Sequence, residues 1–137
     1  MVYRYQYDNA DNLIAYETPV ITENYQYDAN HRMISRTDRL GRMTSYQYDS
    51  FGNLIRQILP NERTITYQYD VLDNLIAVTD ADDITTQYSV RLDQDANRII
   101  HTTSNALNEQ MQVSYDPLGR IRQVIDLDRN GALTFRY

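Results

Sequence analysis

A four-residue motif recurs along the chain at nearly constant spacing, and this periodicity limits the fold more than any other feature. Tyr-Gln-Tyr-Asp occurs unchanged at residues 5–8, 25–28, 46–49 and 67–70, with degenerate copies at 90–93 and 113–116 and a truncated copy at 135–137. The repeat-defining residues are Tyr5, Tyr7, Asp8, Tyr25, Tyr27, Asp28, Tyr46, Tyr48, Asp49, Tyr67, Tyr69, Asp70, Tyr115 and Asp116. Units this short cannot bury an apolar face alone, so the pattern predicts a stacked array of about six repeats.

Each unit has the pattern of a β-hairpin. In Thr64–Tyr69 the apolar and polar side chains alternate, which is the period of a half-buried strand. Asp, Asn and Gly follow each tetrad and supply turn conformations, and Leu75–Thr79 is again β-branched and apolar. No long stretch has helical periodicity. We therefore predict an all-β fold, an array of antiparallel hairpins in one domain over residues 1–137, and the hydrophobic content of 42% is adequate for a packed core.

Composition excludes several functional classes. The net charge is −6 and the basic residues are arginines spread singly, which argues against a nucleic-acid or anionic-membrane partner. There is no cysteine for a disulfide or a cysteine-based zinc site. No apolar run is long enough to span a bilayer, and the first residues do not resemble a signal peptide. No cofactor is expected.

The units resemble the YD repeats of the RHS/YD family, whose pattern is roughly Tyr-x-Tyr-Asp-x-x-Gly-Arg-Leu. The nearest matches are residues 46–54 and 115–121. The family includes bacterial RHS toxins, wall-associated proteins, encapsulating subunits of Tc toxins and teneurins. The resemblance implies a curved sheet, the arc of a spiral β-shell, that encases a toxin-like polypeptide cargo. It also implies a secreted or surface-delivered protein if the chain is part of a larger one.

The chain departs from the family in ways that limit what the resemblance implies. Six units are fewer than family shells contain, and both ends fall within the repeat pattern. Asp116-Pro-Leu-Gly119 resembles the family's self-cleavage motif, but it continues into Arg120 and occupies an ordinary repeat turn. No catalytic residue is therefore transferred to this chain.

Individual residues suggest two other chemistries, metal binding and hydrolysis. Asp126, Asp128 and Asn130 match the start of a Ca²⁺ loop, but the twelfth position is Tyr137, and a repeat turn is the preferred interpretation. Asp93, Asp95 and Asn97 have a similar spacing without glycine. A metal-dependent hydrolase is the weakest alternative. His31 and His101 lie on different repeats and no serine sits in a Gly-x-Ser-x-Gly motif, so we expect surface histidines and no enzyme.

The tyrosines leave two interpretations open. They form cross-strand ladders that hold the sheet together, which we favour, or a stacking platform for carbohydrate or a partner protein. The preferred function is a non-catalytic shell segment, with an adhesion module as the alternative. Because the end strands of an open sheet are unpaired, we also expect the isolated chain either to self-associate through these edges or to rely on its net charge to stay soluble.

Overall fold

The computed structural model describes residues 2–128 and 131–134, and this part of the chain is entirely β. Thirteen strands are present in it, and the predicted strands at 64–69 and 75–79 are confirmed. The described residues contain no helix, and hence none that could cross a membrane. The strands are β1 Arg4–Tyr7, β2 Leu13–Glu17, β3 Thr22–Tyr27, β4 Met33–Asp38, β5 Met43–Tyr48, β6 Leu54–Ile58, β7 Thr64–Tyr69, β8 Leu75–Thr79, β9 Thr85–Asp93, β10 Arg98–Ser104, β11 Gln110–Tyr115, β12 Ile121–Asp126 and β13 Gly131–Thr134.

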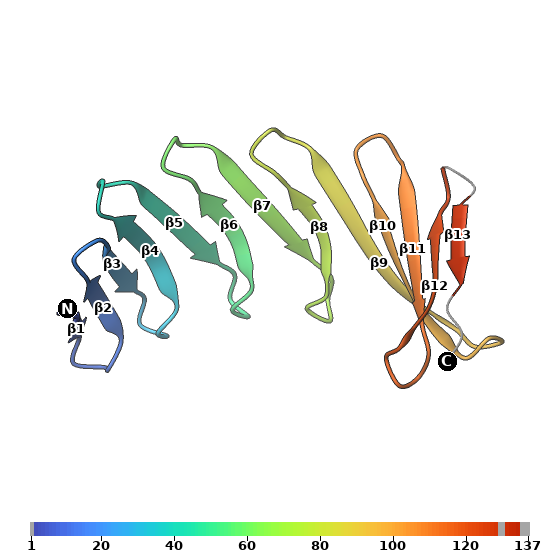
Figure 1. Cartoon of the computed structure of the whole chain (residues 1–137), viewed down its shortest axis with the longest axis horizontal. Coiled ribbons are helices and arrows are strands. Elements are labelled where there is room, and N and C mark those ends of the chain that lie inside the picture. Colours follow the sequence, from blue (N-terminus) through green and yellow to red (C-terminus); the bar gives the residue numbers. More distant parts are fainter. Residues whose placement is uncertain (1, 129–130, 135–137) are drawn as a thin grey trace. The chain divides into compact units, whose positions relative to one another are not determined.

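The chain forms two compact units. The first ends at Tyr67 and the second begins at Gln68. Within the first unit, β1 to β7 pair antiparallel in chain order, and within the second, β8 to β13 do the same. Figure 1 shows each unit as a succession of hairpins. The predicted antiparallel hairpin array is thus confirmed.

Four hairpins contain a β-bulge beside the second tyrosine of the tetrad. In the third repeat, Gln47 pairs with Arg56 while Tyr48 pairs with Leu54, so Ile55 is the extra residue. Equivalent register shifts occur at Tyr7, Tyr27 and Tyr115. The extra residue is always on the returning strand. A bulge bends the strand that carries it, whereas the tetrad strand stays regular.

Neighbouring repeats of the first unit share less backbone pairing than the two strands of one hairpin. Strand β4 pairs with β5 through only three residue pairs, which end at Ser35 and Ser45. The β2–β3 and β6–β7 pairings also have three pairs each. The pairing between repeats lies at the end of the strands away from the tetrad turns, so other contacts must join the repeats near those turns.

The core is much smaller than the composition suggests. Among the described residues, only Ala77 and Ile100 are buried apolar residues, and no large side chain is fully buried. The expectation of a packed core is therefore wrong for the described residues. The reason is architectural: a single layer of hairpins leaves both faces exposed unless something else covers one of them.

Capped turns and a candidate interaction surface

The aspartate of each tetrad organises the turn that follows it. Oδ1 of Asp49 accepts the backbone N–H groups of Phe51 and Asn53, both at 2.9 Å. The Asp49 N–H donates to the Asn53 carbonyl at 3.0 Å, and the Gly52 N–H donates to the Asp49 carbonyl at 3.3 Å. The third residue after the aspartate has positive φ, which is 100° at Gly52. The same arrangement follows Asp8, Asp28, Asp70 and Asp116.

The fourth residue after each of these aspartates completes the turn with its side chain. The Asn12 amide donates to Oδ2 of Asp8 at 2.9 Å, and the Arg32 Nε donates to Oδ2 of Asp28 at 2.7 Å. Asn53, Asn74 and Arg120 make the corresponding contacts. This signal is visible in the sequence, since an aspartate is followed four residues later by Asn or Arg in every regular unit.

These hydrogen bonds favour the ionised carboxylates. The Asn12 side chain, and then its backbone N–H, hold the pKa of Asp8 below its ordinary value. The Arg32 backbone N–H is the largest influence on Asp28, whose pKa is also lowered despite partial desolvation. The pKa values of Asp70 and Asp116 are lowered by the same kinds of donors. At Asp49, desolvation is the largest single effect and raises the pKa, but the combined turn donors outweigh it.

The turns that begin at Asp38, Asp80 and Asn105, at the opposite ends of the strands, use the same geometry. Oδ1 of Asp38 accepts the N–H groups of Leu40 and Arg42 at 2.9 and 3.0 Å. At the β10–β11 turn an asparagine has this role, since Oδ1 of Asn105 accepts the N–H groups of Leu107 and Glu109 at 3.0 and 2.9 Å. A neutral amide therefore suffices as the backbone acceptor.

The degenerate fifth repeat departs from this design. Asp93 accepts the Ala96 N–H at 3.2 Å, and the turn closes between Asn97 and Gln94 at 3.4 Å. Its strands β9 and β10 pair without a register shift from Arg98–Asp93 to Ser104–Gln87. The turn of this repeat thus contains one more residue, and the β9–β10 pairing contains no bulge.

Side chains join neighbouring repeats near the tetrad turns, where backbone pairing between repeats is absent. The Tyr48 hydroxyl donates to the Met33 carbonyl at 2.7 Å. Arg32 donates from Nη1 to the Asp49 carbonyl at 3.0 Å, and its guanidinium lies 4.9 Å from the centre of the Tyr48 ring. His31 Nδ1 lies 2.9 Å from the Asn12 side-chain oxygen of the preceding turn. These cross-repeat contacts were not predicted from the sequence.

In the first unit, the strand registers place the aromatic side chains on one face, called here the tyrosine face (Tyr5, Tyr7, Tyr16, Tyr25, Tyr27, Tyr46, Tyr48 and Tyr67). The opposite face carries mainly Gln, Ser, Thr and Asn. The rings of Tyr5 and Tyr16 lie 5.1 Å apart, as expected of a cross-strand pair. The two tyrosines of β1 are 53% and 58% exposed, while those of β3 and β5 are half-buried.

Several tyrosine hydroxyls on this face are engaged within the sheet. Tyr67 donates to Oε1 of Gln57 at 3.2 Å, and Tyr25 donates to Oε2 of Glu23 at 2.5 Å. Glu23 also forms an ion pair with Arg36. Burial, followed by the hydrogen bond to Glu23, raises the pKa of Tyr25 to about 12, whereas the Arg36 and Tyr25 hydrogen bonds lower the pKa of Glu23. These contacts fit the ladder interpretation of the tyrosines, and binding of a ligand by them stays a prediction.

The second unit has a corresponding aliphatic face, defined by Val78, Tyr88, Val90, Leu92, Ile99, His101, Val113, Tyr115 and Val124. The His101 and Tyr115 rings meet edge to face with centroids 5.0 Å apart. Val90 and Leu92 are each 60% exposed and Ile99 is 38% exposed. Apolar side chains gathered on one uncovered face are typical of an interaction surface.

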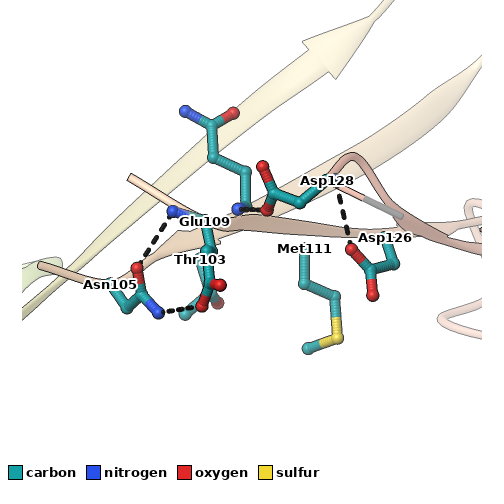
Figure 2. Close-up of a pocket in the computed structure, with 7 residues that line it drawn as sticks. Thr103, Asn105, Glu109, Met111, Asp126 and Asp128 are labelled. Atoms are coloured by element: carbon teal, nitrogen blue, oxygen red, sulfur yellow. Dashed lines mark hydrogen bonds between the residues drawn. The ribbon is translucent and has the colours of Figure 1, made fainter. Parts of the chain in front are cut away.

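The candidate Ca²⁺ residues lie beside a hollow of about 230 Å³ in the second unit, which is shown in Figure 2. Oδ2 of Asp128 accepts the Gln110 N–H at 2.5 Å, and Oδ1 of Asp126 accepts the Asp128 N–H at 3.2 Å. Asn130 and Tyr137 lie outside the described residues. Within the described ranges, no three acidic or histidine side chains gather as a metal ion would require.

The structure does not bring the other candidate residues together into a site. His31 lies in a turn with a φ of 60°, in the first unit, whereas His101 lies within β10 of the second. The Asp116 carboxylate is 7% exposed and bound by Arg120 and Arg122, at 2.8 and 3.4 Å. Asp116-Pro-Leu-Gly119 therefore forms a capped turn like the others.

Comparisons with known proteins agree with this repeat architecture. The sequence model of the RHS Repeat family matches residues 27–58 and 48–85. The fold is similar to the crystal structure of TcdB2–TccC3, with a TM-score of 0.66 and 14% identity over 89% of this chain and 8% of that one. It is also similar to the Photorhabdus luminescens Tc holotoxin pore, with a TM-score of 0.58 and 19% identity over 78% of this chain and 5% of that one. No curated protein sequence matches the chain.

Proposed function

We propose that the chain, of which residues 27–85 match the RHS Repeat family, is a structural repeat segment of that type and forms part of a wall that encases a toxin-like polypeptide. In this proposal, residues 1–137 act as a single array, and the chain itself is not catalytic. The apolar faces of its two units lie against the enclosed polypeptide. The polar faces, rich in Gln, Ser and Thr, meet water.

The observation that carries this proposal is the exposure of apolar side chains on one face of a thin sheet. Val90 and Leu92 of the aliphatic face are each 60% exposed, and Tyr5 and Tyr7 of the tyrosine face are 53% and 58% exposed. In the described residues no second layer covers either face. Covering a surface of this kind with another apolar surface lowers the free energy of the system, so it favours binding.

An extended or partly unfolded polypeptide suits these faces better than a small molecule does. Small-molecule sites are enclosed and combine apolar walls with a few converging polar groups. Here the apolar side chains instead recur from strand to strand as a row, in which Val90, Val113 and Val124 share one face with His101. A row of this kind can contact the apolar side chains of an extended polypeptide along its length.

The polar groups of the described residues support a structural role. The carboxylates of the tetrads accept two backbone N–H groups each in the regular turns. His31 contacts the Asn12 side chain, and His101 contacts the Tyr115 ring. The tetrad aspartates thus stabilise the turns through hydrogen bonds to the backbone. This is the basis for proposing that the chain is not an enzyme.

Binding of a non-native polypeptide tests the proposal. We would measure fluorescence anisotropy of labelled lactalbumin, kept unfolded by reduction and carboxymethylation, as the 137-residue chain is added. Replacing both Val90 and Leu92 by Ser should weaken binding by at least about tenfold, because burying one such side chain contributes roughly 1.5 to 3 kcal/mol. The control Arg91→Ser changes the opposite face between them and should leave binding unchanged. Equal affinity for all three proteins would contradict the proposal.

Carbohydrate binding is the second candidate, favoured by the exposed rings of Tyr5 and Tyr7. Aromatic faces can stack on sugar rings. Quenching of tyrosine fluorescence by oligosaccharides, lost on replacing both residues by Ser, would support it. The hydroxyls of Tyr25, Tyr48 and Tyr67 are already bonded within the sheet, so the inner tyrosines offer less to a sugar.

A further inference from the structure

We propose that β9 accepts an added strand: an extended segment of polypeptide pairs with the backbone of Tyr88–Asp93, on the side of β9 that faces β8. This inference rests on the proposed polypeptide-binding function and deepens it, because it states how part of the polypeptide is held. The added segment has apolar side chains at every second position.

The stretch Tyr88–Asp93 is paired on one side only in the described part of the chain. The pairing of β9 with β10 is continuous as far as Asp93. The pairing of β9 with β8 consists of three residue pairs and ends at Ala77 and Gln87. Figure 1 shows these two strands of the second unit diverging beyond their connecting turn. The backbone of this stretch therefore has no strand partner on the β8 side.

This unpaired stretch is longer than its counterparts in the first unit. Tyr27, the second tyrosine of its tetrad, is the third residue after Asn24, where the β2–β3 pairing ends. The β4–β5 and β6–β7 pairings end at the same distance from their tetrads. Leu92 has the equivalent tetrad position but is the fifth residue after Gln87. Strands of about five or six residues are typical of globular proteins, so Tyr88–Asp93 is long enough to pair with a complete strand.

The tyrosine that joins neighbouring repeats in the first unit is replaced in this repeat. The Tyr48 hydroxyl donates to the Met33 carbonyl of the preceding hairpin, whereas Leu92 has no hydroxyl to donate. Val90 replaces the first tyrosine of the tetrad in the same way. Val90 and Leu92 are each 60% exposed, while Tyr46 and Tyr48 are half-buried. The preceding hairpin thus leaves the side chains of this stretch uncovered.

An unpaired strand of this kind selects an extended polypeptide as its ligand. In an antiparallel sheet, every second residue directs its N–H and C=O groups toward the same neighbour. The β8 side of the stretch therefore presents backbone donors and acceptors at a spacing that an extended main chain matches. Tyr88, Val90 and Leu92 lie on the aliphatic face, and a strand added beside them continues that face. Apolar side chains at alternate positions of the added strand then pack against theirs.

Binding of a short strand-forming peptide tests the added strand. The probe is fluorescein-labelled Val-Thr-Val-Thr-Val-Thr, and its anisotropy is measured as the 137-residue chain is added. Two control peptides carry N-methyl groups on all valines or on all threonines, which removes the N–H donors from one edge and keeps every side chain. One of the two should bind at least about tenfold more weakly than the probe, because it loses several backbone hydrogen bonds. Equal affinity of the three peptides would overturn the proposal.

Amide hydrogen exchange followed by NMR locates the bound peptide. In the free chain, alternate amides of Tyr88–Asp93 should exchange quickly. The amides of Gln112–Ser114 should be protected, because β11 is paired on both sides. Saturating peptide should slow the fast amides at least about tenfold and leave those of β11 unchanged. Unchanged exchange at Tyr88–Asp93 with the peptide bound would place it on the face alone and would refute strand addition.

The results also separate this inference from the proposed function. Binding of unfolded lactalbumin without any change in exchange at Tyr88–Asp93 would refute the added strand and leave the wall proposal intact. Protection of these amides by the hexapeptide, without binding of lactalbumin, would support the added strand and contradict the wall. Protection already present in the free chain, with a mass of twice 16.2 kDa by light scattering, would show that a second copy occupies the stretch. That result too would overturn the proposal.

Discussion

The hydroxyl of Tyr48 donates a hydrogen bond of 2.7 Å to the carbonyl of Met33. This bond joins the third repeat to the second at the tetrad end, where the pairing of β4 with β5 has already stopped at Ser35 and Ser45. The second tyrosine of the tetrad thus supplies a connection that the bulged returning strand cannot make through its backbone. Near the tetrad turns the repeats are joined by side chains, and at the other end of the strands they are joined by backbone pairing.

Removing this hydroxyl should weaken the first unit. We expect Tyr48→Phe to lower the free energy of unfolding by about 0.5 to 1.5 kcal/mol, because the ring packing stays while the Met33 carbonyl loses its donor. Chemical denaturation followed by circular dichroism measures the change. Tyr7→Phe is the control, since Tyr7 is 58% exposed in the first repeat and should change stability by less than about 0.5 kcal/mol. Equal effects of the two changes would contradict the role given to Tyr48.

The cross-repeat contact of Arg32 can be separated from its role in its own turn. Asn12, Asn53 and Asn74 complete their turns as Arg32 does, so Arg32→Asn should keep the turn. It should lose the bond to the Asp49 carbonyl and the contact with the Tyr48 ring. We expect a loss of about 1 to 2 kcal/mol on denaturation.

The matched control for Arg32 is Arg42→Asn. Arg42 binds Asp38 in the same way, at 2.7 Å, but its side chain is 63% exposed and, within the described part of the chain, its guanidinium bonds only to Asp38 of its own turn. Its replacement should therefore change stability by less than about 0.5 kcal/mol. If both variants lose the same stability, the turn and not the cross-repeat contact is responsible.

The hairpins themselves could be predicted from the sequence, because alternation within Thr64–Tyr69 and the aspartates after each tetrad are local signals. The bulge at Ile55 could not, since it arises from the way the capped turn closes between Asp49 and Asn53. The bond between Tyr48 and Met33 depends on how neighbouring hairpins diverge. The arrangement of neighbouring hairpins is a property of the tertiary structure, and the sequence of a single repeat contains no pattern that predicts it.

Acidification should destabilise the fold through the capping aspartates. The pKa values of Asp8, Asp28, Asp38, Asp70 and Asp116 are lower than the ordinary aspartate value of about 3.9. A lowered pKa in the folded chain means that the ionised form stabilises it, so this contribution is complete above the ordinary pKa. It is lost as the pH falls through the folded-state values. Denaturation midpoints should be constant from pH 5 to 7 and fall below about pH 4.

A single-residue version of this experiment uses Asp28→Asn. The amide keeps the Oδ1 acceptor for the turn N–H groups, as Asn105 does naturally, but it cannot be protonated in this range. The variant should therefore lose less stability than the unmodified chain between pH 5 and 2. An identical acid response would contradict the assignment of this sensitivity to the turn carboxylates.

Replacing each of two buried serines by alanine should affect stability in opposite ways. Ser35 donates to Oε1 of Gln26 at 3.0 Å, whereas the Oγ atom of Ser114 has no hydrogen-bond partner in the described chain. Ser35→Ala should therefore cost about 1 kcal/mol, and Ser114→Ala should be neutral or stabilising, because it removes an unsatisfied buried hydroxyl. Thermal denaturation of the two variants side by side tests this. A larger loss for Ser114→Ala would show that its hydroxyl is bonded after all.

The central claim is that one face of this repeat sheet lies against a polypeptide, and photo-cross-linking tests it most directly. An unfolded polypeptide carrying benzophenone groups would be irradiated with the 137-residue chain, and the attached residues would be mapped by mass spectrometry. We predict attachment to Val90, Leu92 and Ile99 of the aliphatic face, and little at Gln87 or Arg91 of the opposite face. Attachment mainly at the polar face, or equally at both, would contradict the account.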